Sequence, residues 1–171
     1  MTEHPQPTTT NLAEESASER ATTAEPEALT QLEATEPDAP LVGIIMGSQS
    51  DMDTMAAAAK VLEDAGVRSE TRVMSAHRDP ATVAEYCKNA RMRGIRVIIA
   101  GAGISAALPG VAAAHTDLPV IGVPLTSRLT AAGGLDAILS IVQMPPGVPV
   151  GCVGLDNPRN AAHLALRILS A

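Results

Sequence analysis

Short apolar runs that alternate with helical stripes constrain the fold of this chain more than any other feature of its sequence. Four near-continuous apolar runs occupy residues 41–46, 97–100, 118–123 and 148–153. Such runs are typical of parallel strands that are covered on both faces. Residues 68–75 alternate apolar and polar side chains instead, which predicts a strand nearer the edge of the sheet.

Between these runs, apolar residues recur at helical spacing. The four stripes are Met52, Met55, Ala59 and Leu62; Val83, Tyr86, Cys87 and Ala90; Leu135, Ile138, Leu139 and Val142; and Ala162, Ala165, Leu166 and Leu169. This spacing predicts helices that bury one face. Helix starts are indicated by Ser50 with Asp53, a possible capping box, and by the pairs Asp79-Pro80 and Asn157-Pro158. Strand–helix alternation predicts a three-layer α/β sandwich with right-handed crossovers.

Charge divides the chain into two parts. Residues 1–40 hold nine acidic residues and one basic residue, whereas the whole chain has a formal net charge of −7. We expect this acidic leader to be disordered, because its composition offers little apolar surface to bury, and to be dispensable for activity. A short helix near residues 25–33 is the alternative. Residues 41–171 are nearly neutral and have the length of one domain.

Composition argues against several classes of protein. A nearly neutral domain lacks the charge of a duplex-binding protein, and one aromatic residue, Tyr86, offers little to stack single-stranded bases. No run of 18 apolar residues predicts a membrane span. Cys87 and Cys152 match no metal-site spacing and favour a reducing compartment. The leader resembles neither a secretory signal nor a transit peptide, so we expect a cytoplasmic protein.

Residues able to carry chemistry gather in segments that follow the predicted strands, where ligands bind in open α/β sheets. Gly47-Ser-Gln-Ser-Asp51 follows the first strand. Glycine permits close approach of the backbone, and N–H groups at a helix start attract anions. The segment could equally be an ordinary capping turn. It is not a P-loop, since the Gly-Lys-Ser/Thr ending is absent.

The second such segment, Ser75-Ala-His-Arg-Asp-Pro80, combines a hydroxyl, an imidazole, a guanidinium and a carboxylate. Histidine can exchange protons near neutral pH, and arginine can bind a carboxylate or phosphate with two hydrogen bonds. The alternative is a surface loop in which Asp79 caps a helix and His77 is solvated.

The third segment, residues 97–106, contains a Gly-x-Gly-x-x-Ala pattern after a strand, which is typical of dinucleotide sites. The acidic partner expected at the end of the next strand is missing, because Asp117 precedes that strand. We therefore favour a pocket wall lined by backbone. His115 and His163 have no partner at ligand spacing, and we expect structural roles for both.

Four motifs together resemble the PurE family, class I N5-carboxyaminoimidazole ribonucleotide mutases of purine biosynthesis. They are Met46-Gly-Ser-Gln-Ser-Asp51, Ser75-Ala-His-Arg78, Ile98-Ile-Ala-Gly-Ala-Gly103 and Ser140-Ile-Val-Gln-Met-Pro145, in the order of the family. The resemblance spans residues 42–169. It implies a flavodoxin-like three-layer sandwich with a central parallel sheet, a homo-octamer, a small ribonucleotide substrate, and neither a metal nor an organic cofactor.

The resemblance also implies roles for individual residues. Matched to the family's motifs, the substrate-binding residues are Ser48, Asp51, Ser75, Arg78, Gly101, Ala102 and Gly103. Ser48, Asp51 and Arg78 are implied to contact the ribose phosphate region. Ser75 and the 101–103 backbone are implied to line the pocket near the base and the migrating carboxylate. His77 is implied to be the general acid and base.

The sequence departs from the family pattern at several positions. Ala107 stands where the family usually has histidine, within Gly103-Ile-Ser-Ala-Ala-Leu-Pro-Gly110, and Met52 stands where tryptophan is common. The segment 127–136 is about two residues longer than usual. These departures leave open how the two loops contact the substrate.

Two other functions remain possible at this level. Class II relatives carboxylate aminoimidazole ribonucleotide with free carbon dioxide, but they usually have lysine after the histidine and lack Gly-Ala-Gly. Arg78 and Gly101-Ala-Gly103 favour the mutase. A non-catalytic nucleotide-binding module is the second alternative, and the proton donor in the His77 loop argues against it.

Overall fold

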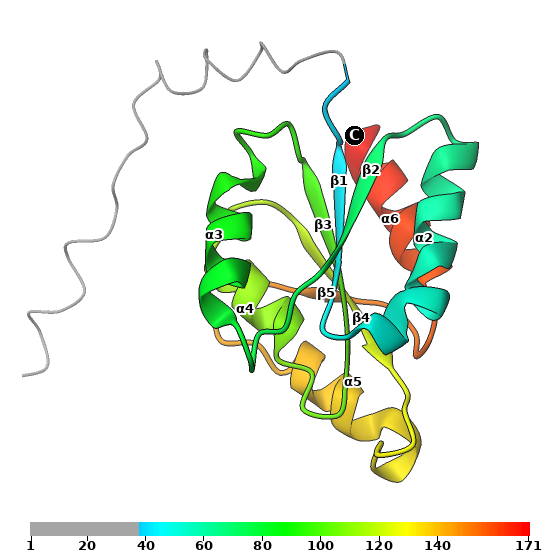
Figure 1. The fold of residues 1–171 in the computed structure, drawn as a ribbon, viewed down its shortest axis with the longest axis vertical. Coiled ribbons are helices and arrows are strands. Elements are labelled where there is room, and N and C mark those ends of the chain that lie inside the picture. Colours follow the sequence, from blue (N-terminus) through cyan, green and yellow to red (C-terminus); the bar gives the residue numbers. More distant parts are fainter. Residues whose placement is uncertain (1–37) are drawn as a thin grey trace, which may run out of the picture. The chain divides into compact units, whose positions relative to one another are not determined.

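The structure is a computed structural model and describes residues 38–171. In this part of the chain, five parallel strands form one sheet in the order β2-β1-β3-β4-β5 (Figure 1). The strands are β1 Val42–Met46, β2 Ser69–Val73, β3 Val97–Gly103, β4 Val120–Leu125 and β5 Gly151–Cys152. The helices are α2 Met52–Asp64, α3 Pro80–Ala90, α4 Leu108–Ala114, α5 Leu135–Val142 and α6 Pro158–Leu169. This strand order is flavodoxin-like, so the predicted fold class is confirmed.

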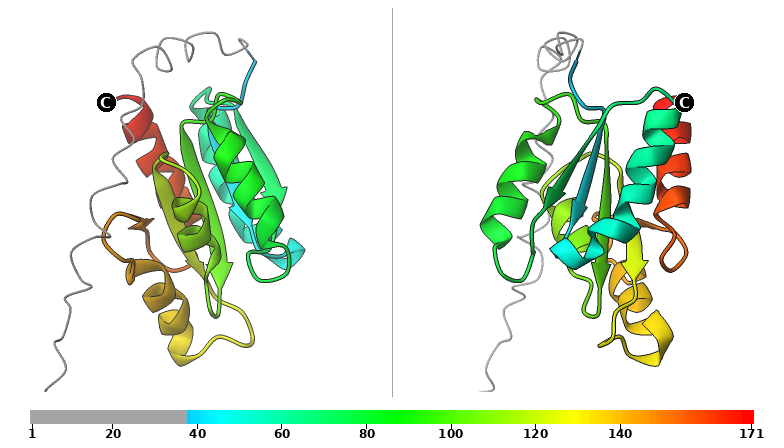
Figure 2. Two further views of the ribbon diagram at one scale, coloured as in Figure 1. Left: turned by 90° about the vertical axis from the view of Figure 1, so that its left-hand side faces the viewer. Right: turned by 45° about the vertical axis from the view of Figure 1, so that its right-hand side comes forward.

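Helices cover both faces of the sheet, which explains the continuous apolar runs. Helices α2 and α6 lie side by side on one face, where Ile44 of β1 and Ile99 of β3 are buried (Figure 2). Helices α3, α4 and α5 cover the other face, where Ile45 and Ile98 are buried. All five residues of β1 are buried, as a strand inside three layers requires.

The two edge strands differ from the central ones. β2 lies at one edge, as its alternating sequence predicted, and exposes Arg72 and Val73. β5 lies at the other edge and pairs through Gly151 and Cys152 only, so the predicted strand over residues 148–153 is too long. Pro149 has no N–H to donate to a ladder, which limits pairing in the first half of that run.

Three of the four helical stripes are buried much as predicted. In α3 the buried residues are those of the stripe: Val83, Tyr86, Cys87 and Ala90. Helix α2 buries Ala58 beside Met55 and Leu62, and α6 adds Ala161. Asp79 and Asn157 cap α3 and α6 as expected, each accepting a backbone N–H three residues ahead.

The prediction for α5 is wrong. This helix buries Ala137 and Ile141, whereas Leu135, Leu139 and Val142 are 47%, 47% and 46% exposed. A Cβ added to Gly122 of β4 would lie 2.5 Å from Ile141 Cγ2, so the side of α5 that carries Ala137 and Ile141 lies close to the sheet. The longer side chains of the stripe therefore face outward in this chain.

The lone tyrosine ties the edge strand β2 to α3. The Tyr86 hydroxyl donates to Glu70 at 3.0 Å, Arg93 donates to the same carboxylate, and the Arg93 guanidinium lies 5.3 Å from the centre of the Tyr86 ring. Gly43 leaves room for the hydroxyl, since a Cβ there would lie 2.3 Å from it. Burial pushes the pKa of Glu70 upward, but the hydrogen bonds from Arg93 and Tyr86 hold it below its ordinary 4.5. Tyr86 is therefore a core residue, as predicted.

The acidic leader predicted over residues 1–40 lies almost entirely outside the described residues. The first residues of the described part contact the domain, because Arg68 Nε donates to the Ala39 carbonyl at 3.3 Å and its guanidinium lies 3.5 Å from Asp38. Among residues 38–171, no helix has the length and apolar character needed to cross a membrane.

Candidate active site

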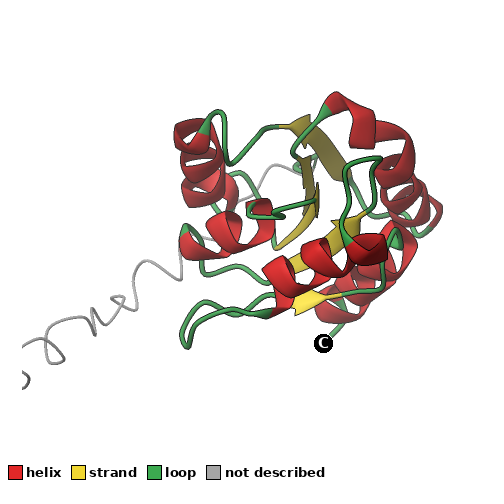
Figure 3. Cartoon of the chain, turned by 90° about the horizontal axis from the view of Figure 1, so that it is seen from below, coloured by secondary structure: helices red, strands yellow, loops and turns green. Residues whose placement is uncertain are grey.

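Loops from four neighbouring strands surround one cavity of about 650 Å³. It lies beyond the carboxyl ends of the strands, the end of the sheet that faces the viewer in Figure 3. The strand order reverses between β1 and β3, and such a switch point leaves a crevice between loops that turn to opposite faces.

The first loop follows β1. Ser48 caps the 3₁₀ turn Gln49–Asp51, because its Oγ accepts the Ser50 backbone N–H at 3.3 Å and the Ser50 hydroxyl at 2.9 Å. The predicted capping box of Ser50 with Asp53 is wrong, since this turn moves the cap back to Ser48. Burial raises the pKa of Asp51, although hydrogen bonds from Ser50 and the Ser48 backbone oppose the rise. Ser48, Ser50 and Asp51 all line the cavity.

The second loop follows β2 and is held at both ends. The Ser75 hydroxyl accepts the Arg78 backbone N–H at 3.3 Å, and Asp79 accepts the Thr82 backbone N–H at 3.2 Å at the start of α3. This closed turn leaves the side chains of His77 and Arg78 exposed at the cavity.

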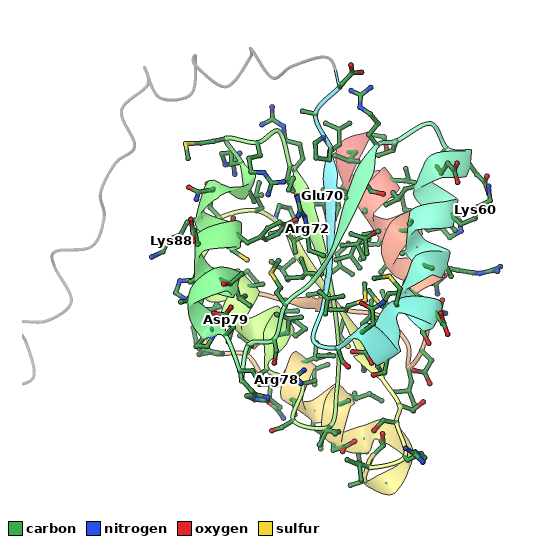
Figure 4. All side chains as sticks on the ribbon, viewed as in Figure 1. Lys60, Glu70, Arg72, Arg78, Asp79 and Lys88 are labelled. Carbon is green, nitrogen blue, oxygen red and sulfur yellow. The ribbon has the colours of Figure 1, made fainter. Side chains whose placement is uncertain are left out.

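Arg78 also connects the second loop to the first. Its Nη2 donates to the Gly47 carbonyl at 2.8 Å, and the side chain lies at the carboxyl end of the sheet (Figure 4). One guanidinium therefore fixes the distance between the two loops and still presents donors to the cavity.

The third loop follows β3, and only part of the Gly-Ala-Gly segment reaches the cavity. Ala102 and Gly103 line it, whereas Gly101 lies deeper in the strand, where a Cβ would be 2.5 Å from the Met55 sulfur of α2. A Cβ on Gly103 would lie 2.7 Å from the Leu125 carbonyl, so this glycine lets β3 end close against β4. Gly101 lies within β3 instead of in a phosphate-binding turn, which removes support for a dinucleotide fingerprint.

Directly after Gly103, Ile104 adopts a left-handed backbone conformation with φ of 59°. Its side chain is 42% exposed and lines the cavity. The turn places Ala106 in the core, and the Ala106 N–H donates to the Ile104 carbonyl at 3.0 Å. A left-handed conformation costs about 1–3 kcal/mol for a residue other than glycine, and β-branched residues tolerate it worst.

The fourth wall is residues 125–129, at the end of β4 and after it, and none of them was among the predicted substrate-binding residues, although the loop 127–136 was expected to contact the substrate. Thr126 and Arg128 line the cavity together with Leu129. The segment carries no motif, and β4 extends two residues beyond the apolar run at 118–123. Its place beyond the carboxyl end of a strand is therefore the one sequence signal that indicates it.

All predicted site residues except Gly101 line this one cavity, whereas His115 and His163 are not part of it. Arg78 and Arg128 supply positive charge, which suits an anionic ligand. A larger groove of about 860 Å³ lies between α2 and β2 and contains none of the motif residues. Within residues 38–171, no three His, Cys, Asp or Glu side chains are grouped to hold a metal ion.

Comparison with known proteins identifies relatives that match the described domain. A profile described as AIR carboxylase matches residues 41–171. The chain is 62% identical over 131 residues to the N5-carboxyaminoimidazole ribonucleotide mutase of Pyrococcus abyssi, covering 77% of this chain and 74% of that protein. It is 56% identical over 131 residues to the mutase of the same name from Aquifex aeolicus, covering 77% of each.

A solved structure of a PurE protein is also similar to this chain. The crystal structure of PurE from Treponema denticola superposes with a TM-score of 0.68 at 36% sequence identity, over 77% of this chain and 80% of that one. The family profile covers the whole described domain from residue 41, including all four cavity loops. The chain therefore belongs to the AIR carboxylase family, to which the PurE proteins belong.

Proposed function

We propose that this chain is an N5-carboxyaminoimidazole ribonucleotide mutase of purine biosynthesis, with residues 41–171 as its catalytic domain. The observation that carries the proposal is the meeting of His77, Arg78 and the Ala102–Gly103 wall at one cavity, in a chain 62% identical to the mutase of Pyrococcus abyssi. The reaction gives 4-carboxy-5-aminoimidazole ribonucleotide.

The proposed reaction is an isomerisation that needs one proton relay. The bond between the exocyclic nitrogen and the carboxylate carbon breaks, carbon dioxide leaves, and the electron pair on nitrogen takes up a proton. The ring carbon then attacks the carbon dioxide, a carbon–carbon bond forms, and that ring carbon loses its proton. His77 is the proposed acid and base, because it is exposed at the cavity and imidazole can exchange protons near neutral pH.

The remaining loops are proposed to hold the nucleotide. Ser48, Asp51 and Arg78 contact the ribose phosphate region, where hydroxyls and a guanidinium are suitable donors. Ser75 and the backbone of Ala102 and Gly103 lie near the base. Carbon dioxide offers little for a charged side chain to bind, so a backbone-lined wall suits it and keeps it beside the ring carbon. Gly101 contributes through packing against Met55.

We further propose that the chain assembles as a homo-octamer in the cytoplasm. The octamer follows from the family resemblance. The exposed face formed by Leu135, Leu139 and Val142 of α5 supports contact with another copy, because three neighbouring apolar side chains are about half exposed in the single chain.

A turnover assay with each of two substrates tests the proposed function. The purified protein should convert N5-carboxyaminoimidazole ribonucleotide without added bicarbonate. Turnover of 5-aminoimidazole ribonucleotide that required free carbon dioxide would favour the carboxylase instead. Tight binding of nucleotide without either reaction would favour a binding module.

A further inference from the structure

We infer that Ile104 is a substrate-contacting residue whose side chain retains carbon dioxide beside the ring carbon. This inference rests on the proposed mutase reaction and adds to it a residue outside the motifs that indicated the function. The family resemblance assigned Ile104 no role.

Core packing does not account for an isoleucine at this position. Ile104 belongs to neither of the two core clusters in residues 38–171, nor to the partly buried residues packed against them. Its φ of 59° is a conformation that glycine or asparagine adopts more readily. The turn could therefore form more easily with another residue, and Ile104 lines the cavity.

Most of the apolar lining of the cavity comes from one pair of neighbouring strands. The loops after β1 and β2 supply its polar side, which includes Asp51, His77 and Arg78. Strands β3 and β4 and the segments after them supply most of the apolar lining, and they also contribute Ser105, Thr126, Ser127 and Arg128; the apolar residues are Ala102, Ile104, Ala107, Leu108, Leu125 and Leu129. Ile104 follows the Ala102–Gly103 wall directly and adds a large apolar side chain to the lining beside it. An apolar group at this position excludes water from a small neutral intermediate.

Retention of carbon dioxide can be measured as a partition between two products. Carbon dioxide that stays is attacked by the ring carbon and gives 4-carboxy-5-aminoimidazole ribonucleotide. Carbon dioxide that escapes leaves 5-aminoimidazole ribonucleotide, with its nitrogen protonated and no new carbon–carbon bond. Single-turnover reactions with enzyme in excess give the ratio of the two nucleotides, after subtraction of the uncatalysed loss of carbon dioxide.

The test compares Ile104→Gly with Ile104→Val and with the control Ala132→Gly. Ala132 is also left-handed, with φ of 47°, but it is exposed and does not line the cavity. We expect Ile104→Gly to raise the escaped fraction relative to product by about tenfold, the scale on which apolar pockets distinguish small groups. Ile104→Val should keep most of the retention, and Ala132→Gly should leave the ratio unchanged.

Three results would overturn this role for Ile104. They are an unchanged ratio in Ile104→Gly, an equal rise in Ala132→Gly, or an Ile104→Val variant as leaky as the glycine variant. If Ile104→Gly fails to fold, Ile104→Asn replaces it, because asparagine tolerates the left-handed conformation but is polar. Absence of turnover in the unmodified protein would refute the mutase function itself, whereas normal turnover with an unchanged ratio refutes only the role of Ile104.

Discussion

Asp156 holds Thr126 with both oxygens of its carboxylate. The Thr126 backbone N–H donates to Oδ1 at 2.8 Å and its hydroxyl donates to Oδ2 at 2.6 Å, while the Asp156 N–H donates to the Pro124 carbonyl at 2.9 Å. Asp156 is left-handed, with φ of 51°, a conformation that aspartate tolerates better than most residues. The turn before α6 thereby fixes the end of β4 and the cavity wall that follows it.

Replacing Asp156 should weaken both the fold and the cavity wall. Asp156→Ala removes two acceptors and puts a less tolerant residue in a left-handed turn, so we expect a loss of about 1–3 kcal/mol in the free energy of unfolding. Asp156→Asn keeps one acceptor and the backbone preference and should lose less. Urea unfolding measures the free energy of unfolding of each variant. Equal stabilities for the two variants and the native protein would show that the hydrogen bonds from Thr126 to Asp156 do not stabilise the fold.

Loss of the imidazole should lower turnover strongly without loss of nucleotide binding. His77 is exposed, so His77→Asn should fold normally and still bind nucleotide. Turnover should fall by ~10²-fold or more, the usual scale of acid–base catalysis. The variant should also fail to exchange the ring-carbon proton of 5-aminoimidazole ribonucleotide with deuterated water, if the native protein does so. Near-native turnover in a folded variant would move the search to Ser48 and Asp51.

Arg78 is expected to bind substrate and not to transfer protons, because its guanidinium stays charged at any working pH. Arg78→Ala should mainly raise KM, and it should also free the Gly47 loop that the guanidinium holds at 2.8 Å. Arg78→Lys should restore only part of the affinity, because an ammonium lacks the planar fork. A fall in kcat with unchanged KM in both variants would show that the assigned role is wrong.

Glu70 should contribute to loss of stability in acid. Its pKa is lower in the folded chain than its ordinary 4.5, so its stabilising effect is complete above that value. The effect is lost as the pH falls through the folded pKa. Glu70→Gln should therefore be less stable at neutral pH and show a shallower decline below about pH 4.5. Urea unfolding at a series of pH values measures the decline. Parallel curves for the two proteins would refute the contribution of Glu70.

The exposed face of α5 should mediate assembly. Leu139 is 47% exposed in the single chain, and Leu139→Glu places a charge on that face, so the variant should dissociate into smaller species. Leu164 on α6 is 36% exposed and provides a matched control, since Leu164→Glu should leave the assembly intact. Light scattering coupled to size-exclusion chromatography distinguishes the two. A native protein that is monomeric at working concentration would remove the basis of this prediction.

Local periodicity in the sequence was sufficient for much of the fold. The apolar runs and stripes are properties of short segments, and they predicted the strands, the helices α2, α3, α5 and α6 but not α4, the edge position of β2 and the buried side of α3. Ligands in open α/β sheets bind beyond the carboxyl ends of the strands. His77, Arg78 and Ser48 follow two such strands and were therefore predicted to lie near one another, because parallel strands end at the same edge of a sheet.

Tertiary structure decided what depends on contacts between distant segments. The apolar stripe of α5 does not predict which side of the helix packs on Gly122. Ile141 packs there, and Leu139 is exposed as a result. Gly101 does not reach the cavity because β3 continues to Gly103, which leaves Gly101 inside the strand and packed against Met55 of α2. The pairing of Thr126 with Asp156 joins residues 30 positions apart, and no local pattern encodes such a contact. Periodicity predicts which residues are apolar enough to be buried, whereas the residues that they contact are determined only when the whole chain packs.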